Sequence, residues 1–74
     1  MTLHRFLIVI EKTGKNFSVY SPDLPGCIAT GKIRRKLKER MHEAIEMHIR
    51  GLIEDGVPVP KSHSSATFVA VQAD

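Results

Sequence analysis

Two polar side chains have the spacing of a metal-binding pair. His42 and Glu46 are four residues apart, so on a helix they lie on the same face and could share a metal ion. Protein zinc sites use three or four ligands from the chain, and no third ligand can be named from this sequence. We therefore predict neither a metal site nor a bound cofactor.

The other reactive side chains also lack partners. Cys27 is the single cysteine, and its apolar flanks favour a small buried side chain over a nucleophile. Asp23 has no second carboxylate in its stretch of sequence. His48 falls among apolar residues, where a hydrogen-bonded core histidine is the expected role. Without a glycine-rich phosphate loop or a Ser-His-Asp order, the sequence predicts a protein that is not an enzyme.

A cluster of basic residues lies in the middle of the chain. The net charge is +3 and the isoelectric point is about 9.4, which raises a nucleic acid or an acidic partner as a binding target. The basic cluster consists of Lys32, Arg34, Arg35, Lys36, Lys38 and Arg40. It is interpreted either as a solvated helix face or as a nucleic-acid-binding surface. The sequence lacks the interleaved aromatic residues that single-strand binders use for stacking.

Apolar patterning predicts four strands and one helix. The strands are expected at residues 3–12, 16–21, 27–30 and 66–73, and residues 13–16 form a hairpin turn by composition. Residues 33–54 carry apolar side chains in one helical arc, which Gly51 interrupts and Gly56 ends. A close packing contact is one reason for a glycine at position 51. The order predicts an α+β fold: a two-layer β-β-β-α-β sandwich with one long helix on a small, mostly antiparallel sheet.

The predicted helix starts without the usual signals. A helix normally begins at a Ser, Thr, Asp or Asn cap with acidic residues in its first turn. Here Arg35 and Lys36 occupy that turn, and Thr30 is the one nearby cap candidate. Cations at this end oppose the helix dipole by about 0.3–1 kcal/mol each.

The stretch at residues 20–31 joins the second strand to the helix. Pro22 and Pro25 fix φ near −65° and remove two backbone donors, so no regular element runs through them. Asp23 can bond its own backbone and Gly26 can adopt a positive φ. The sequence therefore predicts a stiff, shaped loop.

Three pieces of the chain, in this order, resemble the HicB-like antitoxin family. They are VYSPDLPGC with Ala29-Thr30-Gly31 after it, Glu43-Ala44-Ile45-Glu46 with His48, and EDGVPVP at residues 54–60. The resemblance covers residues 5–72. It implies a partial RNase H-like topology in which the acidic metal-binding cluster of a nuclease is absent.

This resemblance implies a partner. HicB-like proteins bind and neutralise HicA-type toxins, which cleave mRNA. The residues predicted to contact the partner are Tyr20, Asp23, Leu24, Pro25 and Gly26. Many relatives carry a C-terminal DNA-binding domain, whereas residues 1–74 are expected to form a single HicB-like domain without one. The alternative function is that of a small nucleic-acid-binding protein that uses the basic cluster.

The first predicted strand is apolar on both faces, and one helix covers only one face. A chain of 74 residues without a disulfide or metal has a marginal core, so we predict a homo-oligomer, at least a dimer. The predicted interface residues are Leu7, Val9, Met47 and Ile53. The other possibility is that residues 57–65 cover the second face. A lone thiol, with no membrane span and no signal peptide, predicts a cytoplasmic protein.

Overall fold

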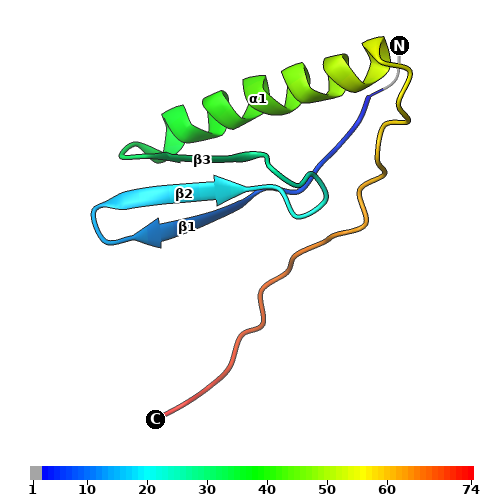
Figure 1. Cartoon of the computed structure of the whole chain (residues 1–74). Helices are drawn as coiled ribbons and strands as arrows, with labels where there is room; N and C mark the ends of the chain where they lie inside the picture. Colours follow the sequence, from blue (N-terminus) through cyan, green and yellow to red (C-terminus); the bar gives the residue numbers. More distant parts are fainter. Residues whose placement is uncertain (1–2) are drawn as a thin grey trace.

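The computed structural model describes residues 3–74 and contains a small sheet with one long helix packed on it (Figure 1). Strands β1 (Val9–Thr13), β2 (Asn16–Tyr20) and β3 (Ile28–Gly31) form an antiparallel sheet in the order β1-β2-β3. Helix α1 (Arg34–Glu54) follows and contacts β2 and β3. The predicted α+β class, with one helix on a small antiparallel sheet, is confirmed.

The strand register sorts the side chains onto two faces. Val9 pairs with Tyr20, and Tyr20 pairs with Ile28, so these three side chains form one row across the sheet. In the next row Ile10 pairs with Val19, which is fully buried. Because successive side chains alternate, Val19 faces α1 and the row of Val9, Tyr20 and Ile28 lies on the helix-free face.

The core lies between the sheet and α1. Its fully buried side chains are Val19, Leu24, Leu37 and Met41, and Cys27 and Ile49 complete the buried cluster. The prediction that Cys27 is a buried side chain is confirmed. Desolvation raises the pKa of its thiol, which keeps it protonated and unreactive near neutral pH.

The prediction of a strand at residues 66–73 is wrong. Residues 57–74 contain no regular element, and residues 3–8 approach the sheet without joining its ladder. The alternating pattern of residues 66–73 is typical of a strand, but a strand also needs a neighbouring edge for its backbone groups. In this structure the segment runs away from the sheet, as the orange-to-red end of the chain in Figure 1 shows.

The buried stripe of α1 is narrower than predicted. Leu37, Met41 and Ile49 are buried, but His48 is exposed, so its assignment as a core histidine is wrong. Three strands present a narrow surface, and only side chains spaced about four residues apart meet it. A Cβ at Gly51 would have no neighbour within 4 Å, so no close contact explains this glycine.

The two ends of α1 differ in how their backbone groups are satisfied. At the C-terminus Gly56 has φ 70°, its N–H donates to Ile53 O, and Val57 N–H donates to Leu52 O. This is the Schellman arrangement and confirms Gly56 as the residue that ends the helix. At the N-terminus Ile33 is the N-cap residue and makes no side-chain hydrogen bond, and the first turn holds no acidic residue.

Replacing Lys32 by Asp and Ile33 by Thr is therefore expected to stabilise the protein. A Thr hydroxyl would accept a free helix N–H and the carboxylate would complement the helix dipole, together worth about 0.5–2 kcal/mol. Ile33 is 49% exposed, so little packing is lost. Thermal unfolding should show a higher midpoint than for the control pair Lys32→Gln and Ile33→Val. An equal midpoint would show that the helix start is already satisfied in another way.

Candidate partner-binding site

The loop at residues 21–27 is closed by its own backbone. Ser21 N–H donates to Cys27 O at 3.2 Å, Leu24 N–H to Ser21 O at 3.2 Å, and Cys27 N–H to Leu24 O at 3.1 Å. Gly26 adopts φ 88°, as predicted. A residue with a side chain would be strained at this φ. Leu24 is 1% exposed and anchors the loop in the core. The loop is therefore a rigid feature, in which Leu24 contributes packing and the outer surface comes from its neighbours.

Asp23 binds the chain that follows the helix. Its Oδ2 accepts hydrogen bonds from Ser62 Oγ, His63 N–H and Ser64 N–H, each at 3.1 Å, and its Oδ1 accepts one from Ser64 Oγ at 3.0 Å. Desolvation alone would raise the pKa of Asp23, but these hydrogen bonds outweigh it and hold the pKa below its usual value. We call residues 62–64 the clasp segment. Sequence reasoning missed this contact because nothing local links two segments so far apart in the chain.

We expect the Asp23 clasp to open in acid. A carboxyl group whose pKa is lowered by folding stabilises the folded form above its unfolded pKa, about 4, and that stabilisation is lost as the pH falls through the folded pKa. The amide chemical shift of Ser64 should therefore titrate at a pH below about 4. In Asp23→Asn the same signal should stay flat. A Ser64 signal that does not titrate in the wild-type protein would show that other contacts hold the clasp segment.

Beside the loop, the helix-free face of the sheet carries an exposed apolar row, which we call the sheet-face row. It consists of Val9, Tyr20 and Ile28, one residue from each strand. Ile28 is 67% exposed, Tyr20 is 37% exposed, and Val9 is half-buried. The row lies at the loop end of the sheet, because Tyr20 and Ile28 flank the loop on either side.

Sequence reasoning missed Ile28, although a signal was available. Ile28 alternates with Cys27 and Ala29, so burying those two neighbours sends Ile28 to the opposite face. Of the predicted partner-binding residues, Tyr20 lies in the sheet-face row, and Pro25 and Gly26 are exposed in the adjoining loop. Asp23 and Leu24 make their contacts within the chain.

The predicted oligomer-interface residues lie on two sides of the molecule. Val9 belongs to the helix-free face, whereas Met47 and Ile53 are exposed on α1. Leu7 is half-buried, and its carbonyl oxygen accepts a hydrogen bond from Ser21 Oγ at 3.0 Å. These residues therefore do not form one continuous patch.

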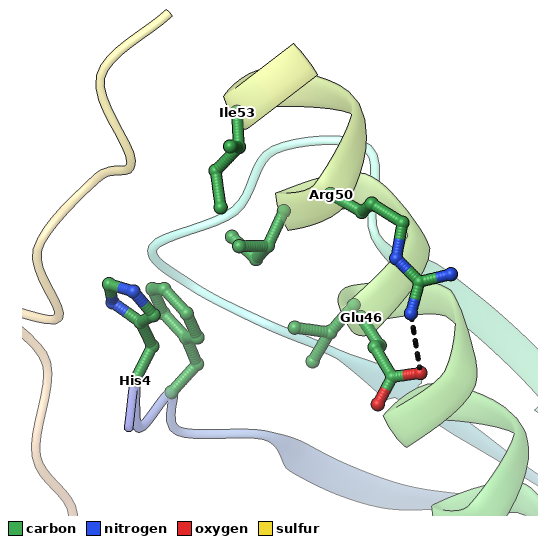
Figure 2. Close-up of a pocket in the computed structure, with 7 residues that line it drawn as sticks. His4, Glu46, Arg50 and Ile53 are labelled. Atoms are coloured by element: carbon green, nitrogen blue, oxygen red, sulfur yellow. Dashed lines mark hydrogen bonds and ion pairs between the residues drawn. The ribbon is translucent and has the colours of Figure 1, made fainter. Parts of the chain in front are cut away.

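A cleft of about 540 Å³ lies between the N-terminal segment and the second half of α1 (Figure 2). Its lining consists of His4, Phe6, Ile45, Glu46, Ile49, Arg50 and Ile53. Arg50 Nη2 donates to Glu46 Oε1 at 3.5 Å on one wall. Within residues 3–74 no three potential metal ligands come together, so the His42 and Glu46 pair gains no third ligand. The lining of the cleft is mainly apolar.

The basic cluster surrounds the start of α1, and all of its six side chains are exposed. Arg40 Nη1 donates to Thr30 O at 3.1 Å and ties the helix to β3. Thr30 therefore contributes its carbonyl here, and its predicted role as the helix cap is wrong. In the part of the chain that the structure describes, no member of the cluster forms an ion pair. Across the same residues, α1 is too polar for a helix that crosses a bilayer.

Comparison with known proteins links the chain to one family. The family model described as HicB_like antitoxin of bacterial toxin-antitoxin system matches residues 6–73. An uncharacterised 14.9 kDa protein from the rep-hol intergenic region of Haemophilus phage HP1 is 36% identical over 62 residues, which cover 84% of this chain and 47% of that protein. The chain therefore spans about half the length of this phage relative.

A second relative comes from an archaeon. A UPF0150 protein of Archaeoglobus fulgidus is 42% identical over 55 residues, which cover 70% of this chain and 80% of that protein. No solved structure matches the chain significantly. Because the family model covers almost all of the chain, the protein belongs to the HicB-like antitoxin family of bacterial toxin–antitoxin systems.

Proposed function

We propose that this protein neutralises a HicA-type, mRNA-cleaving toxin by direct contact through the sheet-face row and the adjoining loop. Membership of an antitoxin family supports a regulatory role without catalysis and a toxin as the partner. The observation that carries the choice of surface is the apolar row of Val9, Tyr20 and Ile28, in which Tyr20 and Ile28 are exposed. An apolar row on an open sheet face is the kind of patch that binds another protein.

The physical properties of this surface suit tight binding. Covering a large apolar side chain such as Ile28 contributes roughly 1.5–3 kcal/mol, and tyrosines are enriched among the residues that dominate interface energies. The adjoining loop is held by three internal hydrogen bonds and the Leu24 anchor. Little loop freedom is then lost on binding, which removes one of the costs that lower affinity.

The proposal places the protein in the cytoplasm, where a toxin of this kind meets mRNA, and it includes assembly into a homo-oligomer. Burying the sheet-face row against toxin leaves α1 on the other side of the sheet available for other contacts. Met47 and Ile53 are the exposed apolar side chains there.

Nucleic-acid binding through the basic cluster is the second candidate. The observation in its favour is that six exposed cations gather around a helix start without carboxylate partners in the described chain. Such binding would weaken steeply with salt, by about 0.9 log unit of affinity for each phosphate contact per log unit of salt concentration. An apolar protein interface has no comparable dependence.

Co-purification with a HicA-type toxin separates the two candidates. We expect the complex to survive nuclease treatment and high salt, and to form equally well with the cluster variant Arg35→Gln and Lys36→Gln. A complex that requires nucleic acid, or that dissociates steadily with salt and is lost in the cluster variant, would instead favour the basic cluster as the binding surface.

A further inference from the structure

Residues 66–73, here called the C-terminal segment, have the sequence of a strand but no sheet. Phe68 is 102% exposed, Val69 is 79% exposed and Val71 is 81% exposed. The segment makes the molecule long, with extents of 54 × 26 × 20 Å and a radius of gyration of 14.7 Å, against about 11 Å for a compact chain of this length. The family match reaches residue 73, so this segment is part of the family's domain. An exposed apolar strand within a domain requires a cover.

Strand β1 offers a free edge of suitable geometry. It is an end strand of the sheet, and Thr13 and Asn16 flank the two-residue turn to β2. Such a pair is hydrogen-bonded, and the antiparallel alternation then turns the N–H and C=O groups of Ile10 and Lys12 away from β2. Among residues 3–74 no strand pairs with this edge. Unpaired groups of this kind form a template for a further strand.

The clasp segment holds the chain beside the residues that lead into β1. Asp23 holds residues 62–64, and a shallow cleft joins the following residues to the stretch just before β1. The lining of that cleft consists of Arg5, Phe6, Leu7, Ser62, Ser64, Ser65 and Ala66. Beyond Ala66 the chain leaves its own sheet and extends away from it (Figure 1). The C-terminal segment therefore starts from an anchored point beside the residues that lead into β1, and it extends away from its own sheet.

We propose that two copies of the chain exchange their C-terminal segments about a two-fold axis, so that each segment adds to the β1 edge of the other copy. Exchange of an identical element is a common route to a dimer. It supplies each sheet with the fourth strand that the sequence predicts, from the second copy. This inference assigns the homo-oligomer of the proposed function to one contact, and it does not depend on toxin binding, since no toxin takes part.

The area involved is sufficient for a stable dimer. Covering Phe68, Val69 and Val71 removes roughly 300–500 Å² of apolar surface from each segment. Two segments together with the surfaces that they cover reach about 1,000–2,000 Å², the size of ordinary stable interfaces. The C-terminal segment has apolar side chains on both of its faces, as do the residues that lead into β1. Both faces therefore gain packing when the segment pairs with the β1 edge.

Light scattering on wild type and two matched pairs of variants tests the exchange. The wild-type protein should have twice the 8.3 kDa chain mass. Val69→Lys with Val71→Lys should give a monomer, while Thr67→Lys with Gln72→Lys, which adds the same charge without removing an apolar side chain, should remain a dimer. Lys12→Pro removes the outward N–H of the β1 edge and should also give a monomer, whereas Lys12→Ala should not.

A wild-type monomer at high micromolar concentration, or a dimeric Val69→Lys, Val71→Lys variant, would overturn the proposal. A dimeric Lys12→Pro protein would overturn the assignment to the β1 edge. If a variant loses the helix signal in circular dichroism, hydrogen exchange of the wild-type protein decides. Slow hydrogen exchange of the Ile10 and Lys12 amides in a dimer would support the swapped segments. Fast hydrogen exchange would contradict them, and so would slow hydrogen exchange in a monomer whose C-terminal segment closes on its own sheet.

Discussion

Leu24→Ala is expected to destabilise the protein by about 2–5 kcal/mol, the usual cost of removing a buried leucine side chain. Leu24 comes from a loop, yet it is as deeply buried as Leu37 on the helix. A chain of this length has a total stability of only about 4–11 kcal/mol. The substitution therefore removes a large share of that stability and also frees the loop that carries the proposed binding surface.

Urea unfolding followed by circular dichroism measures this change. The matched control is Pro25→Ala, next in sequence and exposed, which should shift the unfolding free energy by only about 0.5 kcal/mol. If Leu24→Ala is as mild as this control, the loop is not anchored by Leu24, and the rigidity argued for the binding surface is wrong.

Ile28→Lys is expected to weaken toxin binding roughly 30- to 1,000-fold, the effect of losing about 2–4 kcal/mol at the centre of an interface. The side chain is largely exposed in the free protein, so the fold should be almost unchanged. In the complex the lysine would place a charge among buried apolar side chains, which is costly without a partner.

Calorimetric titration of the toxin with each variant measures the loss. Met47→Lys adds the same charge to an exposed apolar position on α1, on the other side of the sheet, and should bind like the wild-type protein. Equal affinities for Ile28→Lys and wild type would remove the sheet-face row from the interface. Equal losses in both variants would indicate a general effect of charge.

Much of the fold follows from local sequence rules. The hairpin turn at Gly14, the turn at Gly26 and the helix end at Gly56 were predictable because each depends on a few adjacent residues. These three glycines adopt positive φ. The antiparallel sheet and the position of α1 follow from apolar periodicity. Even the buried Cys27 was predictable, since its apolar flanks are local too.

The predictions that failed concern features that depend on contacts between distant segments. The alternation of residues 66–73 correctly describes a strand-like sequence, but no local rule states which edge it meets. His48 falls inside the apolar arc of the helix, and its exposure depends on which part of that arc the sheet covers, which the helix sequence does not encode. Asp23 looked isolated because its hydrogen-bond partners lie beyond the helix.

The candidate site divides in the same way. Tyr20, Pro25 and Gly26 were found because the proline-rich loop stands out in the sequence, whereas Leu24 was assigned outward and is buried. Ile28 emerged only when the strand register placed it beside Tyr20.

Inhibition of mRNA cleavage tests the central claim most directly. A fixed amount of a HicA-type toxin is incubated with labelled mRNA and increasing amounts of this protein, with the Ile28→Lys variant in parallel. The proposed function predicts that cleavage falls to background once the protein matches the toxin in amount, and that the variant inhibits only at much higher concentration. Cleavage that persists with the wild-type protein in large excess would contradict the antitoxin function.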